Sequence, residues 1–218
     1  KVPDSIENLG SMDVLCTDKT GTLTEDRIVL QRHLDIEGKP SQLALIIGYL
    51  NSMHSTGVRN TMDDAVIGAM NKSTGTALPA YRVVDEIPFD FERRRLSVIL
   101  DRVTDLDQLT PPDEVKDVGP QELHLAPGED LLLTKGAVRE VMSVCTRVMH
   151  DGSITALDDA ARATAVATAE SLNSDGMRVL AVSTRIIGAD AARAHFVHDN
   201  WDYTPADEAD MVLIGFLA

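Results

Sequence analysis

A short apolar run over residues 12–17 (MDVLCT) leads directly into Asp18, which heads the heptapeptide DKTGTLT at residues 18–24. The run predicts a buried parallel strand, because such strands are continuously apolar rather than alternating. Open α/β sheets place their chemistry at the carboxyl ends of their strands, where Asp18 would lie. This stretch therefore predicts a piece of a parallel-sheet fold with a functional carboxylate at its edge.

The residues after Asp18 form the surroundings expected of an aspartate nucleophile that faces a phosphate. Lys19 can neutralise negative charge. Thr20 and Thr22 can donate hydrogen bonds, and Gly21 lets backbone N–H groups approach closely. A strand-to-loop turn that arose by chance is the alternative interpretation of these seven residues.

Composition limits the class of protein. The 218 residues can form one large domain or two modest ones. A formal net charge of −15 argues against non-specific nucleic-acid binding, which needs the opposite balance. Two isolated cysteines, Cys16 and Cys145, make no disulfide framework and fit a reducing setting. Apolar runs in the sequence fall short of the roughly 20 residues that a membrane-spanning helix needs.

Patterns of both strands and helices follow residue 27. Apolar or alternating runs predict strands at residues 28–34, 81–89, 96–100, 121–126, 131–134, 178–184 and 211–217. Amphipathic patterns predict helices at residues 42–53, 61–72 and 158–173, and another from Ala137 through Cys145. The second and third strands are expected to pair antiparallel, as are the fourth and fifth, with surface loops at 101–120 and irregular structure at 186–208. This order indicates an α+β fold in which helical hairpins pack on an antiparallel sheet.

Helix ends carry recognisable caps. Ser41 precedes the first predicted helix, and either Asn60 or Thr61 precedes the second. Asp63 lies in the first turn of the second helix, where a negative charge is favourable. Gly176 is placed to end the long alanine-rich helix.

A nucleotide, if bound, is not held by a glycine-rich P-loop or dinucleotide motif, because neither pattern occurs. One aromatic residue, Phe89, is instead accompanied by three cations near strand ends: Arg93, Lys135 and Arg178. Such a set suits an adenine ring stacked on a face, with phosphates held by charge. Three of these four residues have a structural alternative: a place in the core for Phe89, a solvated strand end for Lys135, and an ion pair with a local acid such as Asp175 for Arg178.

The heptapeptide resembles, at every position, the phosphorylation signature of the P-type ion-pumping ATPases. The segments EIPF at 86–89, KGA at 135–137 and GMRVLA at 176–181 resemble the nucleotide-domain motifs of that family, in the family's order. The resemblance covers essentially the whole chain. The residues on either side of the signature, and the segment FDFERRR at 89–95, are most like those of the bacterial magnesium-transporting branch.

The resemblance implies two parts. Residues 1–27 would be the start of a haloacid-dehalogenase-like α/β phosphorylation domain, and residues 28–218 would be the nucleotide-binding domain. Without neighbouring strands, the first part is expected to be disordered or displaced. The remaining phosphorylation, actuator and transmembrane domains would be partners in the same polypeptide. The chain would be the soluble, cytoplasmic part of an integral cell-membrane protein.

The resemblance also implies an ATP site, formed by Phe89, Lys135, Gly136, Arg178, Asp63 and Arg93. Phe89 would stack on adenine, Lys135 would line the back of the pocket, and Arg178 would reach the phosphates. Asp63 lies where many members carry a glutamate that faces the adenine amino group. Aspartate is shorter by one methylene, which puts that role in question. Arg94 and Arg95 are expected to form a solvated turn.

On the same resemblance Asp18 would attack the γ-phosphate and form an aspartyl phosphate that drives ion transport. Mg²⁺ would be held by Asp18, by the backbone carbonyl of Thr20 and by a third acid in the second half of the phosphorylation domain. Lys19 would assist. Related phosphatases carry an aspartate general acid at the position of Thr20, so a threonine predicts a persistent phosphoenzyme. The chain alone is expected to bind ATP without turning it over.

Three alternatives remain open at this point. The chain could be a haloacid-dehalogenase-type phosphatase or phosphotransferase that uses Asp18. It could be a non-catalytic interaction module that retains the fold. It could also belong to a P-type ATPase that transports another ion.

Overall fold

A computed structural model describes residues 13, 14, 16, 17, 28–57, 60–72, 78, 80–102 and 123–218. Within these residues one eight-stranded sheet has the order β2-β3-β4-β7-β10-β5-β6, and β1 also pairs with β10. Its strands are β1 (His33–Leu34), β2 (Tyr81–Ile87), β3 (Arg95–Arg102), β4 (Asp130–Ala137), β5 (Cys145–His150), β6 (Ser153–Ala156), β7 (Leu180–Ile187) and β10 (Met211–Leu217). Neighbouring strands are antiparallel except β10 and β5, which are parallel.

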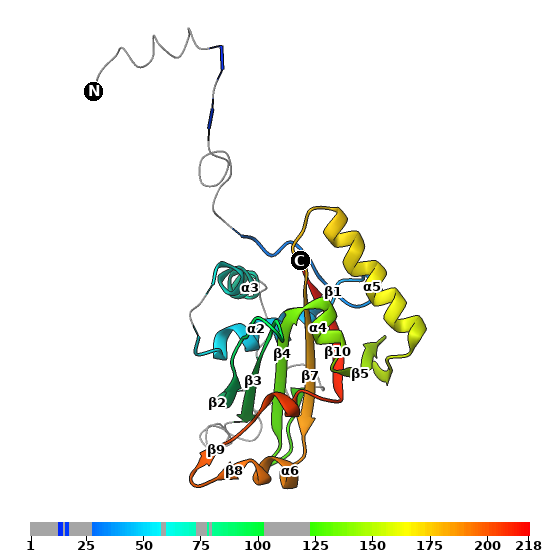
Figure 1. Ribbon diagram of the computed structural model, residues 1–218. Helices are drawn as coiled ribbons and strands as arrows, with labels where there is room; N and C mark the ends of the chain where they lie inside the picture. The colour runs from blue at the N-terminus through cyan, green and yellow to red at the C-terminus, as the bar shows by residue number, and fades with distance from the viewer. Residues whose placement is uncertain are drawn as a thin grey trace, which may run out of the picture.

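Helices cover both faces of this sheet (Figure 1). One face carries α2 (Gln42–His54) and α3 (Thr61–Lys72), and the other carries α4 (Val138–Met142) and α5 (Asp159–Ser174). At one end of the sheet lie α6 (Ala189–Ala194) and the small hairpin of β8 (Phe196–Val197) with β9 (Asn200–Trp201), and the short 3-10 helix η2 (Pro205–Asp207) lies between this hairpin and β10 along the chain. This mixed, mostly antiparallel architecture confirms the predicted α+β class.

The alternation of side chains along each central strand produces two cores. In β4, Leu131 and Leu133 face α2 and α3, whereas Leu132 faces the opposite layer. All three side chains are fully buried, and each contributes roughly 1.5–3 kcal/mol relative to an exposed side chain. A strand that is apolar on both faces is what a sheet between two helical layers requires.

The predicted helix caps are confirmed. Ser41 accepts a hydrogen bond from the N–H of Ala44 at the start of α2, with a distance of 3.2 Å. Asn60, rather than Thr61, caps α3, because its Oδ1 accepts from the N–H of Asp63 at 3.0 Å. Gly176 follows α5 with φ of +81°, the left-handed conformation that glycine adopts most readily at a helix end.

Several predicted elements are wrong or shorter than expected. The strand predicted at 28–34 is reduced to β1. The hairpin predicted from 121–126 and 131–134 does not form, since residues 123–126 are not in a strand and β4 pairs instead with β3 and β7. Residues 103–122, which include most of the predicted loop at 101–120, lie outside the described residues.

The helix predicted through Cys145 is also wrong. It ends at Met142, and Cys145 begins β5, which turns at residues 151–152 into β6. Asp151 and Gly152 both have positive φ, which suits a two-residue hairpin turn whose twist matches that of its strands. Residues 186–208, predicted to be irregular, contain α6 and the β8–β9 hairpin.

The N-terminal stretch bears on the predicted parallel strand. Asp13, Val14, Cys16 and Thr17 are described; none is in a strand, all are exposed, and the side chain of Val14 is 77% exposed. A buried strand is therefore absent at these four residues. In the described part of the chain, we find no helix of the length and apolar character that crossing a bilayer would require.

Candidate functional site: a hollow between α3 and the ends of β3 and β4

A hollow of about 230 Å³ opens where β3 begins, β4 ends and α3 starts. Four of the six residues predicted to hold a nucleotide line it: Asp63, Phe89, Lys135 and Gly136. They come from three separate parts of the chain, and the sheet pairing of Arg95 with Gly136 brings two of these parts together. A second hollow of about 540 Å³ lies between residues 28–33 and α3, and none of the described residues that line it is Phe, Tyr or Trp.

Lys135 and Asp63 form a buried ion pair in the wall of this hollow. The Lys135 ammonium donates to Oδ1 of Asp63 and, at 2.6 Å, to the hydroxyl of the buried Ser52. Both paired side chains are 11% exposed. Burial lowers the pKa of Lys135, and the Asp63 carboxylate opposes that shift. The hollow thus presents a hydrogen-bond donor and an acceptor side by side.

Phe89 lies two residues beyond the end of β2 and offers an open ring face. It is 50% exposed and belongs to neither core, which removes the alternative of a core packing role. Its ring contacts that of Phe91 edge to face, with centroids 5.5 Å apart and planes at 82°. A half-exposed aromatic beside a hollow is the arrangement that ring stacking needs.

Gly136 leaves no room for a side chain. A β-carbon at this position would lie 2.5 Å from the carbonyl oxygen of Arg94 and 2.5 Å from the β-carbon of Arg95. The next residue, Ala137, donates its N–H to that same carbonyl at 3.0 Å. Glycine therefore lets β4 approach the start of β3 and keeps this wall of the hollow flat.

The three consecutive arginines have different surroundings. Arg93 is absent from the residues that line the hollow, and its side chain is only 16% exposed. Arg95, predicted to be solvated, is 11% exposed and donates to the carboxylate of Glu208 at 2.7 Å. Arg94 is exposed, lines the hollow and has φ of +48°. Of the three arginines, Arg94 is the one that the structure brings to the hollow, where Lys135 is also present.

Arg178 lies near the hollow without lining it. It is exposed and follows the Gly176 cap, and Leu180, two residues later, is a lining residue. The ion pair that the structure records for Asp175 is with Arg32, at 3.7 Å, so the predicted local pairing with Arg178 is not the one observed.

A comparison with protein families gives the chain its place. The family model described as "P-type ATPase, cytoplasmic domain N" matches residues 5–218. The chain belongs to this family. That result confirms the resemblance on which the nucleotide-site residues were predicted.

Curated relatives of domain N point to one branch. The chain is 39% identical over 216 residues to the "Magnesium-transporting ATPase, P-type 1" of Salmonella typhimurium strain 14028s, and equally so to that of Escherichia coli K12. These matches cover 99% of this chain but only 20% of each relative. The "Calcium-transporting ATPase 1" of Bacillus cereus is 25% identical over 198 residues, which cover 83% of this chain. The chain thus spans about a fifth of the length of its magnesium-transporting relatives.

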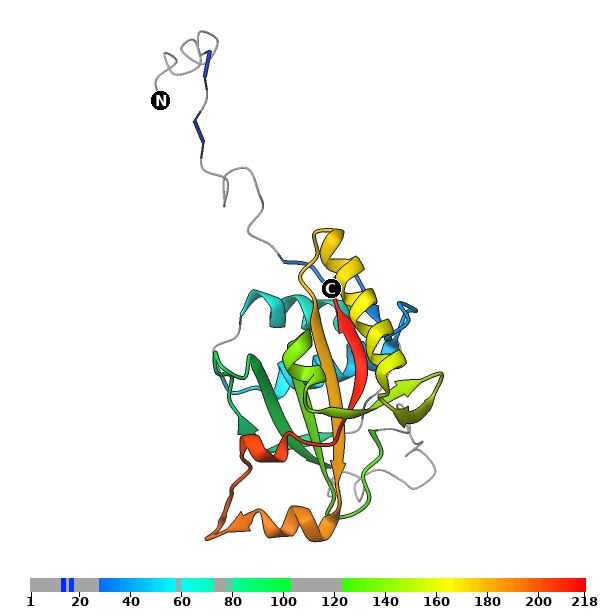
Figure 2. The ribbon, with the colours of Figure 1, turned by 45° about the vertical axis from the view of Figure 1, so that its right-hand side comes forward.

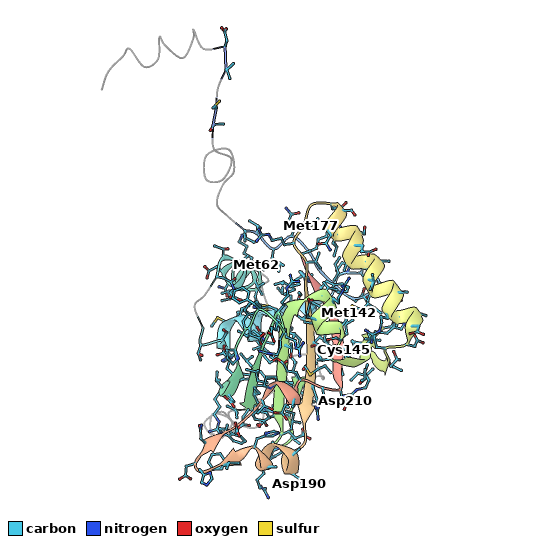
Figure 3. The ribbon with its side chains drawn as sticks, viewed as in Figure 1. Met62, Met142, Cys145, Met177, Asp190 and Asp210 are labelled. Carbon is cyan, nitrogen blue, oxygen red and sulfur yellow. The ribbon has the colours of Figure 1, made fainter. Side chains whose placement is uncertain are left out.

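Sequence reasoning missed several lining residues of domain N. Asn60 and Met62, at the start of α3, line the hollow, as do Leu96 and Leu180 at the starts of β3 and β7. Met62 is labelled in Figure 3. The sequence already indicated that Asn60 could cap α3. In the structure the N–H of Asn60 also donates to Oδ2 of Asp63, at 3.4 Å. What the pattern could not show is that this helix start faces β4.

The residues predicted for catalysis and metal binding, Asp18, Lys19 and Thr20, lie outside the described residues. Among the residues that are described, no group of three or more His, Cys, Asp or Glu side chains is arranged to hold a metal ion.

Proposed function

We propose that this domain N binds ATP in the hollow, with the adenine ring stacked on Phe89. The observation that supports this most is the half-exposed Phe89 ring beside a hollow whose wall carries the Lys135–Asp63 pair. An adenine edge offers a ring nitrogen that accepts and an amino group that donates. The Lys135 ammonium and the Asp63 carboxylate complement these two groups.

The cations near the hollow indicate where the phosphates of the nucleotide would lie. The chain carries a net charge of −15, so a nucleotide polyphosphate is repelled unless local cations offset that field. Arg94 lines the hollow, and Arg178 lies two residues from a lining residue. Both are exposed, so both can turn toward phosphates without losing a buried partner. We therefore assign the phosphates of the bound nucleotide to the neighbourhood of Arg94 and Arg178.

In the whole protein, the bound nucleotide would be presented to Asp18. An oxygen of its carboxylate attacks the γ-phosphorus, the bond from that phosphorus to the ADP oxygen breaks, and ADP leaves with the electron pair. Lys19 would offset charge. The Asp18 carboxylate and the Thr20 carbonyl are oxygen ligands of the kind Mg²⁺ prefers. The chain by itself would bind ATP without turning it over.

We further propose that the protein transports magnesium across the cell membrane, on the cytoplasmic side of which this domain would lie. The support is 39% identity across 99% of this chain to relatives named as magnesium-transporting ATPases. The other domains of the same polypeptide would be its partners.

Calorimetric titration of the chain with ATP tests the nucleotide site. Stacking of a base on an aromatic ring contributes about 1–3 kcal/mol, so Phe89→Ala should weaken ATP binding roughly five- to 150-fold. Phe196→Ala is a matched control, because Phe196 is 48% exposed but lines a different groove, near Arg82. Equal affinities of the wild-type and Phe89→Ala chains would overturn the proposal.

A further inference from the structure

The backbone on both sides of Phe89 is held by one guanidinium group. Arg93 donates from Nη2 to the carbonyl of Pro88, the residue before Phe89, and from Nε to the carboxylate of Asp90, the residue after it. β2 ends at Ile87, and Pro88 has no N–H, so this stretch lies beyond the strand's ladder of hydrogen bonds. Beyond the end of the strand, hydrogen bonds from the Arg93 guanidinium hold the backbone in place of strand pairing.

Arg93 is in turn anchored in the interior. Its Nη1 lies 2.7 Å from both carboxylate oxygens of Glu208, a residue 115 positions later in the chain. The Glu208 side chain is fully buried, and it also accepts from Arg95 and from the Ser97 hydroxyl, each at 2.7 Å. A buried carboxylate with this many charge-assisted hydrogen bonds is held firmly in place, because moving either arginine away would weaken the compensation of a buried charge.

The turn that contains Phe89 is braced internally as well. Oδ1 of Asp90 accepts from the N–H of Glu92 at 2.8 Å and of Arg93 at 2.7 Å. The N–H of Arg94 donates to the Asp90 carbonyl at 2.8 Å. The turn is therefore one unit, and the Arg93–Glu208 pair connects it to the interior of the domain.

All three guanidinium nitrogens of Arg93 are thus engaged, and two carboxylates offset its charge. We propose that Arg93 and Glu208 are positioning residues that hold the Phe89 ring over the hollow, and that Arg93 is not a phosphate ligand. This inference rests on the proposed function, because it concerns the residue on which adenine would stack.

A series of nucleotides separates positioning from phosphate binding. Titrations with AMP, ADP and ATP, followed by NMR chemical shifts, would compare the wild-type chain with Arg93→Lys, which keeps the charge but loses the fork. Because all three ligands share the base, Arg93→Lys should lower the affinity for each by the same factor, roughly three- to thirtyfold. Arg94→Gln, the neighbouring control, should lower ATP affinity more than AMP affinity.

A double-mutant cycle supplies the readout that a general loss of stability would not produce. In a Phe89→Ala background, Arg93→Lys should cause no further loss of AMP affinity. A loss that grows from AMP to ATP, or one that persists without Phe89, would overturn the positioning role. If Phe89→Ala itself leaves binding unchanged, the proposed ATP site fails instead.

Asp90→Asn provides a second variant should Arg93→Lys fail to fold. Asp90 is 44% exposed at its side chain, so its substitution leaves the interior pair of Arg93 with Glu208 intact. It should weaken AMP and ATP binding by one common, smaller factor. Unchanged affinity for both AMP and ATP would contradict the proposal that Arg93 holds the turn around Phe89 in position.

Discussion

At the scale of single residues, two buried groups give this domain a characteristic alkaline behaviour. The Cys145 thiol lies at the start of β5 and donates to the carbonyl of Val141 (Figure 3). Burial raises its pKa from 9.0 to about 12. The Tyr81 hydroxyl donates to the carbonyl of Leu123 at 2.8 Å, and burial raises its pKa from 10.0 to about 12, opposed by Arg102.

These two shifts predict how stability depends on pH. The native state keeps both protons until about pH 12, whereas the unfolded chain releases them from about pH 9 upward. The stabilisation is therefore fully present below pH 9 and is lost as pH rises toward 12. Together the two groups should lower the free energy of unfolding by about 2–3 kcal/mol between pH 8 and pH 10.5.

Urea unfolding at a series of pH values measures this effect. The double variant Tyr81→Phe/Cys145→Ala is the control, since it has neither proton to lose, and its free energy of unfolding should fall less over the same range. Parallel pH profiles for the wild-type and double-variant chains would contradict the assignment.

The Lys135–Asp63 pair shows that the short aspartate side chain reaches from α3 to β4. Asp63 is close enough to bond Lys135 directly, across 72 residues of sequence. Removing one partner of such a buried pair typically costs 3–5 kcal/mol, because the other charge is left without a partner. Nucleotide binding by single variants of either residue would therefore mix lost contacts with lost stability. For that reason Phe89 is the better first test.

At the scale of elements, the close approach of β3 and β4 depends on Gly136. A β-carbon there meets backbone and a β-carbon at 2.5 Å, and neither can rotate away. Gly136→Ala should therefore force the strands apart and destabilise the domain by roughly 1–3 kcal/mol, as overpacking does.

Gly68 in α3 is the matched control. A β-carbon at Gly68 meets no atom within 4 Å, and alanine is the better helix former. Gly68→Ala should raise the free energy of unfolding by up to about 1 kcal/mol. Urea unfolding of the two variants should give opposite signs, and destabilisation by both would refute this account of the strand contact.

At the scale of the whole molecule, the described body closes on itself where the chain enters and leaves. The N–H groups of Gln31 and Arg32 donate to the carbonyl of Ala218, each at 2.9 Å, and the N–H of Ala218 donates back to the carbonyl of Arg32. Figure 2 shows the C-terminus beside the incoming segment. The two ends of residues 28–218 therefore lie side by side and are hydrogen-bonded to each other.

This arrangement predicts that residues 28–218 fold and bind ATP without residues 1–27. A chain that lacks residues 1–27 should match the full chain in free energy of unfolding and in ATP affinity, measured by urea unfolding and calorimetry. A chain that lacks residues 1–34 should be less stable, because it also loses the pairing of β1 with β10. A large loss of stability on the shorter deletion would place the domain boundary elsewhere.

The elements with strong local signals were predictable from sequence. α2, α3, α5 and β10 lie within two residues of their predicted bounds, because amphipathic periodicity, caps and apolar runs act over a few neighbouring residues. The short strands β5, β6, β8 and β9 were not predicted. β5 pairs with the distant β10. β6, β8 and β9 pair within local hairpins, but each is only two to four residues long, too short for an alternating pattern to be distinctive.

The site divides in the same way. The sequence by itself determined the family, through the heptapeptide at residues 18–24 and the motifs around Phe89 and Lys135, because these are local patterns. Only the tertiary structure decided that Arg94, rather than Arg93, lines the hollow. The side chain of Arg94 is directed by the positive φ of that residue. The side chain of Arg93 is directed by its pairing with Glu208, 115 residues later in the chain. No local pattern carries that information, because the contact exists only once β3 and the segment before β10 have come together.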